Sequence, residues 1–139
     1  MVTAKMKWTG GLKFECISAW GHKIVTDADK QAGGEEVGYK PTELLLYGIT
    51  GCTGIDVVRI LEKQRQQLNS LEIELIAHQN EKYPKPFHTI EVKFTARGKN
   101  LSEEKVAKAI ELSEGKYCVV SQTVIYPGQV VSTHEVINE

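Results

Sequence analysis

The sequence lacks an excess of charge of either sign. Its 139 residues include 17 Lys and Arg against 18 Asp and Glu, a net charge of −1. Domains that bind nucleic acid or anionic membranes usually carry a clustered basic excess, so neither partner is expected. No uninterrupted apolar run approaches the roughly 18 residues that span a bilayer. The opening stretch MVTAKMKWTGG also lacks the apolar segment of a signal peptide. We therefore expect a cytoplasmic protein without a membrane span.

Cysteine is also scarce, with only Cys16, Cys52 and Cys118 in the chain. An odd, sparse set without a secretion signal argues against a disulfide scaffold. No two of the three have the short spacing of a structural zinc site, so no metal is expected. Two interpretations are left for these residues: a catalytic or redox pair, and small buried hydrophobic side chains.

The length and the 41% hydrophobic content suit one soluble globular domain over residues 1–139. Near the start, Gly10 and Gly11 separate two short apolar runs, which predicts a hairpin. Residues 23–26 read as a third strand, and the polar, Gly-rich residues 27–40 read as a loop.

A long helix is expected next. Pro41 suits a first helical turn, and no proline follows until well past residue 66, where the helix is expected to end. The first part of this segment is apolar nearly all round and the last part is charged. This pattern is typical of a central helix that reaches solvent at its end.

The second half of the chain alternates and then turns helical. Residues 71–78 and 88–98 place apolar side chains at every second position, which predicts two half-buried strands, with Gly98 in a loop at the strand end. Ser102 is a good N-cap for a second helix, and Gly115 is expected to be its C-cap. Residues 116–125 fit either a short helix or a strand, and residues 130–137 read as a last strand.

Three glycines interrupt the long helix at every third position, with a thiol among them: Gly48, Gly51, Cys52 and Gly54. Each glycine costs about 1 kcal/mol relative to alanine inside a helix, so something must offset the loss. A phosphate loop is excluded because no Gly-Lys-Ser/Thr follows. Close packing against another backbone is the better interpretation, and the helix of a twofold partner is one candidate.

Cys52 lies on one helix face with Gly48 one turn before it and Asp56 one turn after it. The missing side chain at Gly48 leaves a slot beneath the thiol. We expect Leu45, Ile49 and Ile55, or the same residues of a partner chain, to line it. The carboxylate of Asp56 would raise the pKa of the thiol. From these residues alone, Cys52 is either a functional thiol or a small side chain at a crowded helix crossing.

Two segments together resemble a known family. They are GYKPTELLLYGITGCTGIDVVRILEKQRQ, which carries Cys52, and ELSEGKYCVV, which carries Cys118 66 residues later. With the order of predicted elements over nearly the whole chain, they look like the OsmC/Ohr family, and most like its YhfA-type branch.

The resemblance implies an α+β fold in which antiparallel sheets wrap around long central helices in an intertwined homodimer. It also implies a peroxidase that reduces organic hydroperoxides to alcohols. Cys52 would be the peroxidatic thiol, Cys118 the resolving thiol, and an external dithiol the reductant. No metal or organic cofactor is implied.

The sequence departs from the Ohr pattern in two places. Ohr-type members carry an arginine in the N-terminal region, whereas the first arginine here is Arg59, which leaves Lys23 or Lys40 as a substitute. They also carry a glutamate ten residues before the thiol, where this chain has Thr42 followed by Glu43. The departures favour an alternative, a dimeric binding protein for a small apolar or electrophilic ligand. The retained cysteine pair favours the peroxidase.

Overall fold

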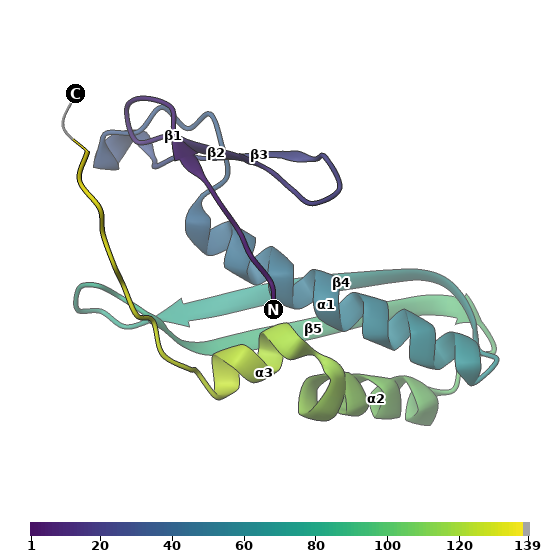
Figure 1. Ribbon diagram of the computed structural model, residues 1–139. Coiled ribbons are helices and arrows are strands. Elements are labelled where there is room, and N and C mark those ends of the chain that lie inside the picture. The colour runs from purple at the N-terminus through teal and green to yellow at the C-terminus, as the bar shows by residue number, and fades with distance from the viewer. Residues whose placement is uncertain (138–139) are drawn as a thin grey trace. The chain divides into compact units, whose positions relative to one another are not determined.

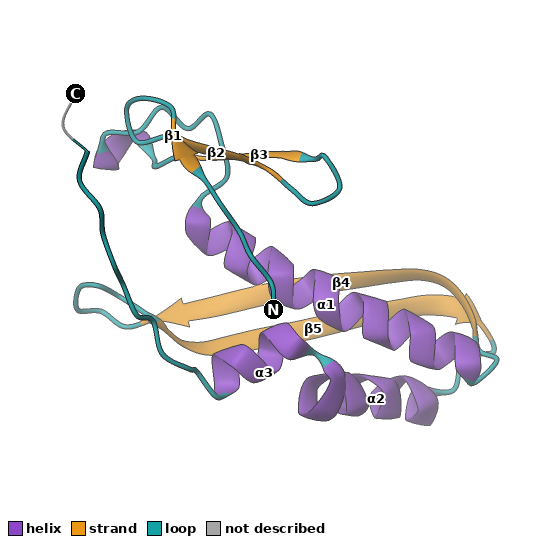
Figure 2. Cartoon of the chain, viewed as in Figure 1, coloured by secondary structure: helices purple, strands orange, loops and turns teal. Residues whose placement is uncertain are grey.

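The structure is a computed structural model that describes residues 1–137 (Figures 1 and 2). The chain forms two compact units, Met1–Gly48 and the remainder from Ile49 onward. The boundary falls inside the long helix α1 (Pro41–Lys63), which therefore contributes residues to both units. The fold combines antiparallel sheets with helices, as the sequence predicts.

The N-terminal unit contains a three-stranded antiparallel sheet. Its strands β1 (Lys7–Trp8), β2 (Phe14–Ile17) and β3 (Lys23–Thr26) lie in chain order. Gly10 and Gly11 take φ values of 106° and 55° in the first turn, a region that favours glycine. The predicted hairpin and third strand are therefore confirmed.

A single buried carboxylate organises the loop of this unit. Asp27 accepts hydrogen bonds from three backbone N–H groups, those of Ala28, Glu35 and Val37, at 2.8, 3.0 and 3.3 Å. Burial pushes the pKa of Asp27 upward, but these donors outweigh it and hold the pKa below its usual value. The loop includes one short 3₁₀ helix, η1 (Lys30–Ala32).

The second unit is built on a two-stranded antiparallel sheet. Strands β4 (Gln67–Gln79) and β5 (Phe87–Lys99) include the predicted ranges 71–78 and 88–98 and extend beyond both. Side chains along them alternate between half-buried and exposed, as expected for a sheet covered on one face. Gly98 lies within β5 and not in a loop: a Cβ there would come within 2.0 Å of the Gln67 carbonyl oxygen.

Helix α1 ends three residues earlier than expected, at Lys63. Arg65 has a positive φ of 56°, which no helix continues, and β4 begins at Gln67. Within α1, buried residues recur every four positions, so that one stripe of the helix faces the core: Ile49, Thr53, Val57 and Leu61. By length and composition α1 could also cross a membrane, a test that the core helix of a soluble protein passes equally.

The core of the second unit lies where two helices meet the sheet. Helix α2 (Glu103–Leu112) begins after Ser102, whose side chain accepts from the Lys105 N–H, so the predicted N-cap is confirmed. Its Ala109 packs with Val57 and Leu61 of α1. Half-buried side chains from α1, both strands and α2 surround this cluster: Ile60, Leu68, Leu71, Phe94, Val106 and Ile110.

In the C-terminal region two predictions are wrong, and the choice between a helix and a strand for residues 116–125 is decided. Gly115 does not cap α2, because the chain continues into a π-helical turn, η2 (Ser113–Tyr117). The next segment is the short helix α3 (Val119–Ile125) and not a strand. Residues 130–137 form no strand: their backbone pairs with no strand among the described residues, and a strand requires such a ladder.

The expected glycine groove is only partly filled within the chain. A Cβ at Gly54 would lie 3.2 Å from Ile73 Cδ1, so β4 approaches the helix there. A Cβ at Gly51 would meet no described atom within 4 Å. Close packing inside the protomer therefore accounts for Gly54 but not for Gly51.

Candidate active site

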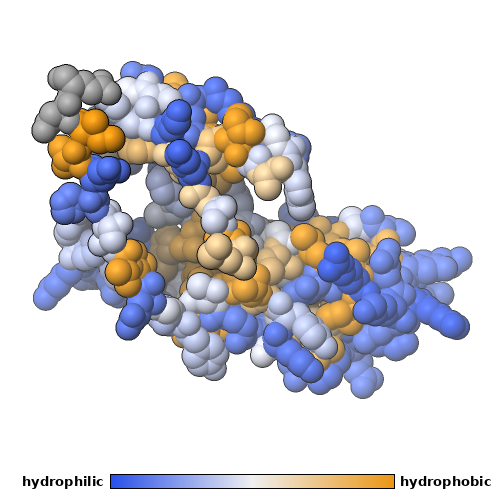
Figure 3. Space-filling view, in the orientation of Figure 1, coloured by the Kyte–Doolittle hydropathy of each residue, from blue (hydrophilic) through white to orange (hydrophobic). Residues whose placement is uncertain are grey.

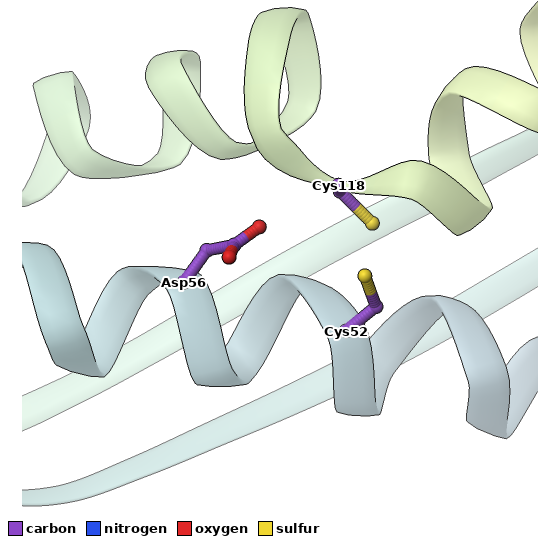
Figure 4. Close-up of side chains that lie close together, drawn as sticks. All are labelled: Cys52, Asp56 and Cys118. Carbon is purple, nitrogen blue, oxygen red and sulfur yellow. The ribbon is translucent and has the colours of Figure 1, made fainter.

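Three side chains in the second unit converge between α1 and the start of α3. Cys52 and Asp56 lie one turn apart on α1, and Cys118 lies between η2 and α3. The two sulfurs and a carboxylate oxygen of Asp56 all lie within 4.8 Å of one another. Figure 4 shows the two sulfurs pointing toward one another across the gap between the segments. Residues 66 positions apart are thus brought into reach of one another.

The π-helical turn places Cys118. Instead of ending at a cap, α2 widens by one residue, and the Cys118 N–H donates to the Ser113 carbonyl at 2.8 Å. The Cys118 side chain is fully buried. The turn therefore carries the thiol from the end of α2 into the interior against α1.

Two protein donors reach the sulfur of Cys118. The Thr53 hydroxyl lies 3.5 Å from it, and the Ser121 N–H lies 3.3 Å from it. Burial alone would raise the pKa of Cys118, but the hydrogen bonds from Ser121 and Thr53, together with the Cys52 thiol, lower it. The surroundings of Cys118 therefore stabilise a thiolate.

The surroundings of Cys52 act in the opposite direction. Burial raises its pKa most, and the Cys118 thiol and the Asp56 carboxylate raise it further against a hydrogen bond from the Val120 N–H. The predicted effect of Asp56 is confirmed. The surroundings of Cys118 thus favour its thiolate, and those of Cys52 favour its protonated form.

Asp56 is itself held in place. The Ser113 hydroxyl donates to Asp56 Oδ2 at 3.0 Å, and Ser113 is fully buried. The same residue thus orients the carboxylate through its side chain and the Cys118 backbone through its carbonyl. Ser113 acts as the positioning residue of the cluster.

A small apolar cavity lies in the second unit, with Ser121 in its lining. Its volume is about 190 Å³, and its apolar lining comes from α1, β5 and α3: Ile49, Ile90, Val92, Val124 and Ile125. Ser121, whose N–H reaches Cys118, also lines it, as does Glu114, whose pKa is raised by burial. Of the residues expected to line the slot, Ile49 lines this cavity, whereas Leu45 and Ile55 are exposed in the protomer.

The other predicted site residues lie in the N-terminal unit. Thr42 and Glu43 belong to the first turn of α1, where Glu43 accepts from the Lys40 N–H at 3.2 Å. Gly48 is the last residue of that unit. Lys23 is paired with Glu15 in the same unit. The groups that act most strongly on the Cys52 thiol include no cation.

Sequence reasoning missed Thr53, Ser113 and Ser121. A signal existed for Thr53, because a polar residue stands on the buried stripe of α1 and a buried hydroxyl needs a partner. Ser113 carried the same signal, because it falls on the predicted inner face of the second helix with Val106, Ala109 and Ile110. Ser121 carried none, since its role depends on how η2 leads into α3.

Comparison with known proteins identifies the fold. A family model described as OsmC-like protein matches residues 33–133, which is well over half of the chain. The chain belongs to the OsmC-like family. It is 35% identical over 134 residues to Protein YhfA of Escherichia coli K12, covering 96% of this chain and 97% of YhfA.

Solved structures with a similar fold agree with this assignment. A hypothetical protein from Aquifex aeolicus is 33% identical and superposes with a TM-score of 0.77, covering 88% of this chain and 86% of its own. An organic hydroperoxide resistance protein OsmC from Legionella pneumophila has a TM-score of 0.62 at 18% identity, covering 89% and 90%. At that identity, the likeness to the Legionella protein is one of fold alone.

Proposed function

We propose that this OsmC-like protein is a thiol-dependent peroxidase that reduces organic hydroperoxides to alcohols. The observation that carries the proposal is the convergence of the Cys52 and Cys118 sulfurs within 4.8 Å in the reduced protein. Two thiols at this separation can close into a disulfide with a small movement, which is the chemistry that a peroxidatic and a resolving cysteine require.

Cys52 is the attacking thiol because it is the more accessible one. Cys118 is fully buried, whereas Cys52 is half-buried. The Cys52 proton first passes to the Cys118 thiolate along their hydrogen bond. The Cys52 thiolate then attacks the terminal oxygen of the hydroperoxide and the O–O bond breaks. Cys52 becomes a sulfenic acid, and the alkoxide takes the proton from Cys118 and leaves as the alcohol.

Cys118 is the resolving thiol. Its thiolate, stabilised by Thr53 and Ser121, attacks the sulfenic sulfur of Cys52. A disulfide forms, and the hydroxyl group leaves as water after taking a proton from solvent. An external dithiol then reduces the disulfide and restores both thiols. The cycle needs no metal or organic cofactor.

The substrate is proposed to be an organic hydroperoxide with a small alkyl or aryl group. The cavity lined by Ile49, Ile90 and Val124 offers apolar surface beside Ser121, whose N–H reaches the Cys118 sulfur. Burying about 100 Å² of a substrate there would contribute about 2.5 kcal/mol, which hydrogen peroxide does not gain. The name of the Legionella relative, an organic hydroperoxide resistance protein, supports this substrate class.

The working form is proposed to be a cytoplasmic homodimer. Several large apolar side chains of α1 are exposed in the protomer: Leu45, Tyr47, Ile55 and Val58. Gly51 leaves open space on the same helix, where a partner backbone can approach closely. Apolar side chains also stand exposed elsewhere on the surface (Figure 3). A second copy would bury this surface.

The test is hydroperoxide consumption by the purified, reduced protein with excess dithiol. We expect stoichiometric alcohol and a kcat/KM for cumene hydroperoxide at least about tenfold above that for hydrogen peroxide. Cys52→Ser should abolish turnover, and Cys16→Ser is the matched control. Equal rates on both peroxides would contradict the role of the cavity.

The raised pKa of Cys52 favours one second candidate, a binding protein for a small apolar or electrophilic ligand without turnover. Absence of turnover with any peroxide, together with saturable binding of an apolar ligand or alkylation of Cys52 by an electrophile, would support that candidate and overturn the peroxidase.

A further inference from the structure

We propose that the reduced site binds Zn²⁺ through Cys52, Asp56 and Cys118, and that zinc and hydroperoxide compete for the same two thiols. The three side chains offer two sulfurs and one carboxylate oxygen, all within 4.8 Å of one another. The competition rests on the proposed peroxidase function, whereas the metal binding does not.

The spacing suits one tetrahedral ion. With Zn–S bonds of about 2.3 Å and a Zn–O bond of about 2.0 Å, two sulfur ligands lie about 3.8 Å apart and a sulfur and an oxygen about 3.5 Å apart. The observed separations are at most 4.8 Å. They exceed the tetrahedral values by no more than about 1.0 Å for the two sulfurs and about 1.3 Å for a sulfur and the oxygen. Small side-chain rotations of Cys52 and Asp56, both only half-buried, would close the difference.

The ligand set distinguishes zinc from other metals. Two thiolates disfavour Mg²⁺ and Ca²⁺, which take oxygen ligands. Cu(I) is satisfied by sulfur alone and gains little from a carboxylate. Zn²⁺ accepts both ligand types and commonly keeps a water in its fourth position when the protein supplies three ligands. Cys52 and Asp56 are only half-buried, so that side of the cluster is open to solvent.

The surrounding hydrogen bonds match those of an outer shell. Ser113 donates to Oδ2 of Asp56 and leaves Oδ1 with lone pairs for a metal. Thr53 and the Ser121 N–H donate to the Cys118 sulfur, which fixes its position against α1 and supports a ligating thiolate. Outer-shell donors of this kind orient the ligands in known metal sites.

Zinc binding slows peroxide reduction, and the disulfide that peroxide reduction forms excludes zinc. Binding displaces the protons of the two thiols, and the bound thiolates are held by the metal. Reaction of the loaded site with a hydroperoxide consumes two protons and gives the disulfide, alcohol, water and free Zn²⁺. The disulfide has no thiolate left to bind the ion. Zinc therefore protects the thiols and inhibits turnover, and oxidation releases zinc.

The test measures Zn²⁺ affinity by competition with a chromophoric chelator, in a Cys16→Ser background that removes the cysteine of the other unit. We expect one ion per chain for the reduced protein and none for the disulfide form. Cys52→Ser, Cys118→Ser and Asp56→Asn should each weaken binding about tenfold or more, and Ser113→Ala by a smaller factor. Glu62→Gln, which removes an exposed carboxylate from the same helix, should leave the affinity unchanged.

Co²⁺ serves as a spectroscopic probe of the same site. We expect a thiolate-to-metal charge-transfer band in the reduced protein, with ligand-field bands that change in Asp56→Asn. An Asp56→Asn variant with unchanged zinc affinity, equal binding by the disulfide form, or no binding at all would each overturn the proposal. Peroxide turnover without zinc binding would contradict the metal site and leave the proposed peroxidase function intact. Zinc binding without turnover would leave the metal site standing and remove the proposed function.

Discussion

The two units of the chain differ in how they bury side chains. In the second unit, α1 and α2 close over the sheet around a core that includes Val57, Leu61 and Ala109. In the N-terminal unit only Thr26 and Asp27 are buried, both polar, and apolar residues such as Trp8 and Ile17 stand exposed. The second unit has the core of an independent fold, whereas the first is held largely by its strand ladder and by hydrogen bonds to Asp27.

The two units also differ in function: one holds the candidate site, and the other exposes apolar surface that a partner can cover. Both thiols of the pair and every donor to them come from the unit with the apolar core, which can hold side chains at fixed separations. The N-terminal unit exposes apolar side chains to solvent. Exposed apolar surface of this kind often marks an interface with another protein. The candidate site therefore lies in the second unit, and we expect a partner copy to cover part of the first.

The largest effect should come from the core of the second unit. Leu61→Ala removes a fully buried side chain and should lower the free energy of unfolding by about 2–5 kcal/mol. Ile17→Ala in the N-terminal unit removes a side chain that is 66% exposed and should change it by no more than about 0.5 kcal/mol. Urea unfolding at low protein concentration measures both. Similar losses in the two variants would remove the contrast between the units.

Two glycines provide the next comparison. A methyl group at Gly98 would clash with the Gln67 carbonyl, so Gly98→Ala should cost about 1–3 kcal/mol at every protein concentration. A Cβ at Gly51 meets open space in the protomer, and leucine is a better helix former than glycine. Gly51→Leu should therefore keep or raise protomer stability, by up to about 1 kcal/mol. It should weaken the dimer about tenfold, seen by sedimentation, if a partner helix packs there. An unchanged dimer in Gly51→Leu would remove the glycine groove from the interface.

The smallest expected effect is the pH dependence that the two thiols give to the free energy of unfolding. Because the pKa of Cys118 is lowered, its thiolate stabilises the fold above the ordinary thiol pKa of about 8.5, and this stability is lost as pH falls through the lowered value. Because the pKa of Cys52 is raised, its protonated form stabilises the fold below the ordinary value, and this is lost as pH rises through the raised value. The pair therefore contributes most near the ordinary thiol pKa.

Urea unfolding over a pH series, with reductant present, tests this dependence. The stability difference between the wild type and the Cys52→Ser, Cys118→Ser double variant should pass through a maximum. A flat difference would mean that neither pKa is shifted by folding.

The local pattern of the chain predicted most of its elements. The hairpin at Gly10, the long helix after Pro41, the two strands and the cap at Ser102 each follow from turn chemistry, periodicity or capping, which depend on neighbouring residues. The failures lie where the structure depends on distant partners. Gly115 was predicted to be a C-cap, but η2 continues the helix past it. Residues 130–137 alternate, but they pair with no strand among the described residues.

The site was predictable in part. The two cysteines came from the resemblance to the family, and the effect of Asp56 on Cys52 came from their spacing on one helix face. The roles of Thr53, Ser113 and Ser121 depend on how η2 and α3 meet α1, which no spacing reveals. The spacing rule for zinc sites considers cysteines close in sequence. It therefore overlooks a cluster whose ligands come from two distant segments.

The roles proposed for Cys52 and Cys118 are tested most directly by the bond that forms when the reduced protein reacts with one equivalent of cumene hydroperoxide. Peptide mapping under non-reducing conditions identifies the bond, and an accompanying assay measures the alcohol released. We expect an intrachain Cys52–Cys118 disulfide in yield equal to the alcohol, with Cys16 still a free thiol. A Cys16–Cys52 bond, or over-oxidised Cys52 beside an untouched Cys118, would contradict the account.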